Sequence, residues 1–172
     1  MRKLKIMSLL VYLVFVNNFS AVAADSSESS VLAPMKNSPW GHANDLSINY
    51  KPQKLLYDLT TSDPKKLDNI LDRVSYLFKL YDSEMFDSSI VIIIHGEAIP
   101  FFAIDQLSKY KERMIRVNSL TIGTTIEFRM CKAAAKLMDY KAQDIHGFVT
   151  MVPMADAEIV RLQNEEGYAY MR

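Results

Sequence analysis

Cysteine is almost absent from this chain, which has Cys131 as its single example among 172 residues. One thiol excludes an internal disulfide. Exported proteins usually pair their cysteines, so a lone cysteine in such a chain is buried and inert, paired between chains, or functional. The sequence leaves these alternatives open.

Several motifs of common enzyme classes are also missing. The chain has no P-loop, no GxGxxG and no GxSxG, so the usual nucleotide-binding and serine-hydrolase functions have no support. His95, Cys131 and His146 lack tight metal-ligand spacing, and the ten methionines fit core packing better than a copper site. We therefore predict neither a metal nor a cofactor.

An excess of charge of either sign is missing too, because 20 Lys and Arg residues balance 20 Asp and Glu residues. Loss of residues 1–24 would remove three basic residues and no acidic ones, which leaves a slightly acidic chain. Such a balance does not indicate nucleic acid or an anionic membrane as a partner.

The first 24 residues have the pattern of a signal peptide. A basic start at Arg2, Lys3 and Lys5 precedes an apolar run over residues 6–16, and residues 21–23 have the small-x-small form of a cleavage site. The run is shorter than the roughly 20 residues of an ordinary membrane span. We expect an exported, periplasmic protein, with an uncleaved anchor as the alternative. Residues 25–53 read as a flexible leader and an irregular arm, and residues 54–172 as the folded domain.

From residue 54 onward, apolar periodicity predicts alternating strands and helices. We expect strands over residues 55–59, 89–94, 124–130 and 148–152, with a short edge strand at 168–171. Helices are expected from Asp63-Pro64, from near Pro100 to Gly123, over 132–138 and over 155–166. Helical crossovers between successive strands predict an α/β fold of three layers with a mostly parallel sheet of about five strands.

Three strand exits carry polar or reactive residues, and parallel strands would bring all three to one edge of the sheet. They are His95-Gly96, Cys131, and the turn at residues 153–156. Cys131 joins a strand to a helix, where free N–H groups and the helix dipole favour a thiolate. We predict Cys131 as a nucleophile and His95 as an acid, base or persulfide partner. The alternatives are a cysteine that packs silently under residues 133–135 and a histidine that only holds a turn.

The segment at residues 128–136, Phe-Arg-Met-Cys-Lys-Ala-Ala-Ala-Lys, resembles the Cys-x-Ala-Ala segment of the DsrE/TusD sulfur-relay proteins of the DsrE/DsrF-like superfamily. Ile94-His95-Gly96-Glu97-Ala98, residues 149–153, Arg161-Leu162-Gln163 and residues 167–170 extend the likeness to the exported DsrE-like branch. The resemblance covers residues 54–171. The chain departs from it after the short helix, where it has Leu137-Met138-Asp139-Tyr140 in place of Arg-Arg-Gly.

This resemblance implies an α/β/α sandwich with a mostly parallel five-stranded sheet, and a homo-oligomer. It implies that Cys131 accepts sulfane sulfur as a persulfide and passes it on. The expected partners are sulfur donors and acceptors, either proteins or small sulfur species. The alternative is a non-catalytic oligomeric binding module of the same fold, with Cys131 structurally buried.

Overall fold

The computed structural model describes residues 39–81 and 87–172. The predicted signal peptide and the start of the predicted leader lie outside the described residues. Residues 47–172 form one compact unit, and residues 39–46 belong to a separate unit in which the described part has neither helix nor strand. The domain is described below by itself.

A five-stranded parallel sheet forms the centre of the domain. Its strands are β1 (Lys54–Leu59), β2 (Ser89–Ile94), β3 (Ile126–Cys131), β4 (Val149–Val152) and β5 (Ala169–Met171), in the order β4-β3-β2-β1-β5. The β-branched run of β2 therefore occupies the middle of the sheet, and its residues from Ile90 to Ile94 are fully buried. Burial on both faces explains why this strand is apolar throughout instead of alternating.

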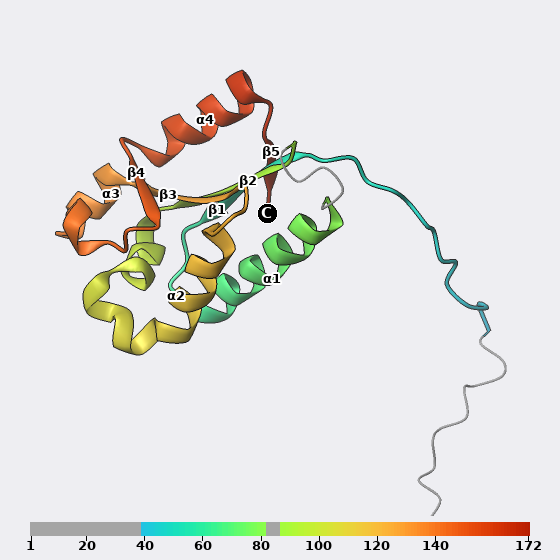
Figure 1. The fold of residues 1–172 in the computed structure, drawn as a ribbon, viewed down its shortest axis with the longest axis horizontal. Helices are drawn as coiled ribbons and strands as arrows, with labels where there is room; N and C mark the ends of the chain where they lie inside the picture. The colour runs from blue at the N-terminus through green and yellow to red at the C-terminus, as the bar shows by residue number, and fades with distance from the viewer. Residues whose placement is uncertain (1–38, 82–86) are drawn as a thin grey trace, which may run out of the picture. The chain divides into compact units, whose positions relative to one another are not determined.

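Helices cover both faces of the sheet (Figure 1). They are α1 (Pro64–Leu80), α2 (Leu107–Thr121), α3 (Lys132–Leu137) and α4 (Ala155–Glu166). Figure 1 shows α1 and α2 together on one face and α4 on the opposite face. The predicted three-layer α/β sandwich is confirmed. None of the described helices combines the length and the apolar character needed to cross a membrane.

The start of α1 follows directly from its sequence. The Asp63 carboxylate accepts the Lys65 N–H at 2.9 Å, and Pro64 occupies a position where its missing N–H costs nothing. Three residues spaced by four and three positions, Leu67, Leu71 and Val74, are buried against the sheet. Capping and amphipathicity thus agree, as the sequence predicted.

The two faces of the sheet are packed unequally. The larger apolar cluster lies on the α1 and α2 side and includes Phe128 and Met130, whereas the smaller one lies under α4 and includes Cys131. This follows from the alternation of β3, which sends successive side chains to opposite faces. Cys131 therefore lies on the face that α4 covers, where Ala134 of α3 also packs against the cluster.

The segment between β2 and α2 differs from the prediction. In place of a helix that opens near Pro100, the structure has two 3₁₀ helices, Gly96–Phe102 and Ile104–Gln106, before α2 begins at Leu107. Pro100 lies inside the first of them, and neither has a side-chain cap, so a regular α-helix does not start there. Gly123 adopts a left-handed φ of 68° just after α2, as predicted for a helix-ending glycine.

Candidate functional site

The carboxyl edge of the sheet brings the two predicted site residues to neighbouring positions. The last register pair of β2 and β3 is Ile94 with Met130, so the next residues along the two strands are His95 and Cys131. Because Cys131 and His95 each follow a residue that faces the α1 and α2 side, both belong to the face covered by α4. Among the described residues, no hydrogen bond joins the thiol to the imidazole ring.

Cys131 is both the end of β3 and the N-cap of α3. Its backbone is extended, with φ −65° and ψ 110°, and its Sγ accepts the Ala134 N–H at 3.3 Å. A cysteine sulfur that accepts a main-chain N–H at a helix start satisfies one of the free N–H groups of that end. The residue is only 5% exposed and packs beside Val91 and Ile93. Its reagents must therefore be small.

The helices that follow β3 and β4 pack on opposite faces of the sheet beside Cys131. After β3 the chain enters α3, whose buried Ala135 belongs to the cluster on the α1 and α2 side, whereas after β4 it enters α4 on the other side. Cys131 pairs in register with Val152 of β4, and the Ala133 N–H donates to the Pro153 carbonyl at 3.2 Å. Open α/β sheets bind ligands outside the carboxyl ends of their strands, above all where the strand order reverses. In this sheet the order reverses between β1 and β5, whereas Cys131 lies at the same carboxyl edge between β3 and β4.

His95 is held by Asp58, and Asp58 is held in turn by Tyr170. Sequence reasoning gave neither residue a role in the site. The His95 Nε2 lies 2.7 Å from Asp58 Oδ1, and the Tyr170 hydroxyl donates to Asp58 Oδ2 at 3.0 Å. Because an ionised carboxylate can only accept, the Nε2–H donates, and this tautomer leaves Nδ1 as an acceptor. The three side chains come from β1, β5 and the exit of β2, so the sheet register itself assembles them.

Burial and the nearby Asp58 carboxylate raise the pKa of Tyr170 above its ordinary value, with burial the larger cause. Tyr170 therefore stays protonated at neutral pH and keeps donating to Asp58. In this way a phenol and an imidazole fix both oxygens of one carboxylate.

The other two histidines lie elsewhere. His146 stacks on the Phe148 ring, with centroids 5.4 Å apart, and burial lowers its pKa, which favours the neutral ring. His42 is exposed and belongs to the separate unit. In the described part of the domain, no three His, Cys, Asp or Glu side chains gather as a metal site would require.

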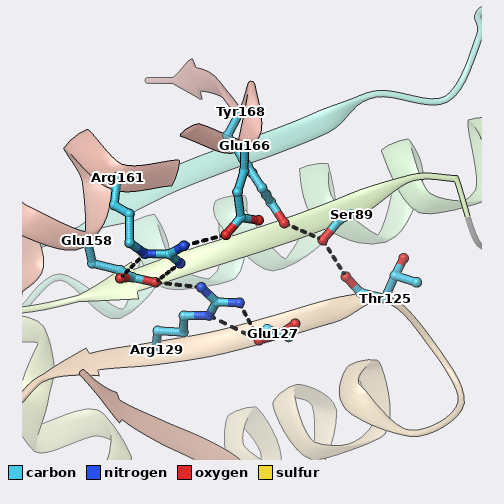
Figure 2. A network of polar contacts seen from close by, with 8 residues as sticks. All are labelled: Ser89, Thr125, Glu127, Arg129, Glu158, Arg161, Glu166 and Tyr168. Atoms are coloured by element: carbon cyan, nitrogen blue, oxygen red, sulfur yellow. Dashed lines mark hydrogen bonds and ion pairs between the residues drawn. The ribbon is translucent and has the colours of Figure 1, made fainter. Parts of the chain in front are cut away.

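A network of ion pairs fastens α4 onto the face that contains Cys131 (Figure 2). Arg129, two residues before the thiol, bonds Glu127 at 2.8 Å on its own strand and Glu158 of α4 at 2.5 Å. Glu158 also accepts from Arg161, which in turn pairs with Glu166. Mainly through the Arg161 hydrogen bonds, and also through Arg129, the pKa of Glu158 is lowered. These contacts hold the helix that covers the thiol.

A solved structure with a similar fold is a protein of unknown function, MTH1491, from Methanobacterium thermoautotrophicum. It matches with a TM-score of 0.57 and 20% sequence identity, over 70% of this chain and 98% of that chain. At this identity the likeness concerns the fold alone. No protein-family profile matches the chain. No curated protein matches it either.

Two sequence signals could have led to the partners of His95. Asp58 follows the apolar run Leu55–Tyr57 just before the end of its strand. Tyr170 is the middle residue of the last strand, so its side chain points to the face opposite that of Ala169 and Met171. Both observations place a polar group near the carboxyl edge of the sheet. They do not pair the two residues, because they are 112 positions apart and only the β1–β5 register brings them together.

We expect Asp58→Asn to lower the pKa of Tyr170 toward its ordinary value, since the substitution removes the negative charge beside the phenol. NMR titration of tyrosine labelled at Cζ measures this pKa directly. Asp156→Asn, which alters an exposed carboxylate at the start of α4, is the control. An unchanged Tyr170 titration in Asp58→Asn would contradict the assigned hydrogen bond.

Proposed function

We propose that this protein carries sulfane sulfur as a persulfide on Cys131. The observation that supports it most is the position of the thiol at the carboxyl edge of the sheet, where β3 meets α3 and Sγ accepts the Ala134 N–H. The resemblance of residues 128–136 to a sulfur-accepting segment points to the same chemistry. The signal-peptide pattern of residues 1–24 supports an exported, periplasmic location.

The chemistry needs no cofactor. The Cys131 thiolate attacks the outer sulfur of a polysulfide, and a new S–S bond forms while the bond behind that sulfur breaks. The electron pair leaves with the shortened polysulfide, so the total oxidation state is unchanged. Attack by an acceptor thiolate on the outer sulfur of the persulfide then returns the electron pair to Cys131.

His95 is the proton carrier in this proposal. Its Nε2–H is committed to Asp58, so Nδ1 can take the thiol proton and return it after transfer. Asp58 and Tyr170 are positioning residues, since they act on sulfur only through the ring of His95. The near-complete burial of Cys131 favours small sulfur species as donors, and a homo-oligomer of this chain is the expected assembly.

Intact-mass spectrometry after brief exposure to polysulfide tests the proposal. The protein should gain about one or two sulfur atoms, dithiothreitol should remove them, and Cys131→Ser should gain none. Because the chain has no other cysteine, this single variant removes every thiol. Loading that persists in Cys131→Ser, or no loading of the wild-type protein, would contradict the carrier role.

A non-catalytic binding module of the same fold is the second candidate, and the burial of Cys131 in the cluster under α4 favours it. Alkylation distinguishes the two functions. A carrier thiol should react with iodoacetamide in the native protein at a rate that rises with the thiolate fraction. A packed, silent thiol should react only after the protein unfolds.

A further inference from the structure

A second candidate site lies at the carboxyl end of β1, outside the surroundings of Cys131. A cavity of about 410 Å³ opens there between the strand exit and the first half of α1. This volume is within the range of small-molecule sites. Its lining is rich in hydrogen-bond donors and includes two threonine hydroxyls and one amide, from Thr60, Thr61 and Asn69.

Four basic side chains surround this cavity, namely Lys65, Lys66, Arg73 and Arg172. Asp58 is the single carboxylate in the lining, and its oxygens already accept from His95 and Tyr170. Four basic side chains and one side-chain carboxylate give the lining an excess of positive charge.

The arginines of the domain show how unusual this excess is. Four of the six arginines in the described residues pair with carboxylates: Arg113, Arg116, Arg129 and Arg161. The two that pair with no Asp or Glu side chain among the described residues are Arg73 and Arg172, and both line this cavity. Arg73 instead donates to the main-chain oxygen of Arg172 at 2.6 Å and lies over the Tyr57 ring.

The two lysines lie at a helix end where the helix dipole disfavours positive charge. Lys65 and Lys66 occupy the first turn of α1, where the helix dipole favours negative charge, and that turn has no acidic residue. The carboxylate at this end of the helix is that of the N-cap Asp63, which accepts the Lys65 N–H. Two lysines, two arginines without an Asp or Glu partner and a cavity thus indicate the same kind of ligand.

We propose that this cavity binds a small oxyanion with two or more negative charges, either a phosphate ester or a polycarboxylate. Lys65 and Lys66 supply point charges, Arg73 offers a planar pair of donors, and the Thr60 and Thr61 hydroxyls complete the polar surroundings. The inference goes beyond sulfur transfer and does not depend on it, since Cys131 takes no part.

Isothermal titration calorimetry at constant ionic strength, with pyrophosphate and with citrate, tests this proposal. The protein should bind at least one of them, and the double variant Lys65→Gln/Lys66→Gln should bind it at least about tenfold more weakly. Lys65→Arg/Lys66→Arg keeps the charge and should retain binding. Lys111→Gln/Lys136→Gln makes the same charge change at two exposed lysines of α2 and α3 and should bind like the wild type.

The outcome with each anion is informative. Binding of pyrophosphate alone assigns a phosphate ligand, and binding of citrate alone assigns a carboxylate ligand. The proposal is overturned if neither anion binds the wild-type protein below about 10 mM, or if both Gln double variants lose affinity equally. Equal loss would mean that the overall charge of the protein, and not this cavity, attracts the anion.

Discussion

Replacing Phe128 with alanine should lower the free energy of unfolding by about 3–5 kcal/mol. Phe128 lies in the middle of β3, is almost completely buried, and packs near Phe102 with ring centroids 6.0 Å apart. Its neighbours in register are Ile92 of the central strand β2 and Val149 of the edge strand β4, and the sheet hydrogen bonds that hold these strands limit collapse into the space left behind. A loss of this size is a large share of the stability of an ordinary domain.

Chemical denaturation with urea measures this effect, and Leu137→Ala is the matched control. Leu137 is 88% exposed on α3, so its truncation should change stability by less than about 0.5 kcal/mol. Phe128→Leu, which keeps most of the buried volume, should fall between the two. If Phe128→Ala cost no more than Leu137→Ala, the assigned core of β3 would be wrong.

Local sequence patterns were sufficient for most of the fold. The β-branched run of β2 indicated a strand buried on both faces, and Asp63-Pro64 with its periodic apolar residues indicated α1. These signals are reliable because each is decided within a few residues. The 3₁₀ segment at Gly96–Phe102 was not predictable in this way, since its apolar run has no clear period and contains Pro100. Its conformation depends on the core that it packs into.

The candidate site was predictable only at the level of single residues. Parallel topology placed His95 and Cys131 at one edge of the sheet, and in the structure each lies one residue beyond the last register pair, Ile94 with Met130. The burial of Cys131 depends on where α4 lies, and the Asp58–His95–Tyr170 cluster depends on β5 pairing with β1. Both depend on tertiary contacts between segments far apart in the sequence. The residues next to Cys131 and His95 do not reveal these contacts.

Glu158→Gln should lower the free energy of unfolding by about 1–3 kcal/mol at neutral pH, because it removes the carboxylate that Arg129 and Arg161 share, while Glu127 and Glu166 still pair with these arginines. The Glu158 side chain is 11% exposed and bonds Arg129 of β3 and Arg161 of its own helix. Glu165→Gln removes one charge from an exposed position of the same helix and should have little effect. The comparison separates the network from the general loss of an acidic residue.

The pH dependence of this difference has a definite sign. The pKa of Glu158 is lower in the folded protein than its ordinary value, so its stabilising effect is complete above the ordinary carboxyl pKa. It is lost as pH falls through the folded pKa, where the wild-type carboxyl becomes neutral like the amide of the variant. Urea denaturation of wild type and Glu158→Gln should therefore give curves that converge on acidification. Curves that stay equally far apart down to the lowest pH at which the protein is folded would contradict the ion-pair assignment.

The same variant links the network to the candidate site. Because α4 covers the face that contains Cys131, weakening its attachment should increase local opening and accelerate alkylation of the thiol in the native protein. Glu165→Gln should leave the alkylation rate unchanged. If Glu158→Gln lowered stability without any faster reaction of Cys131, access to the thiol would be controlled by a part of the protein other than α4.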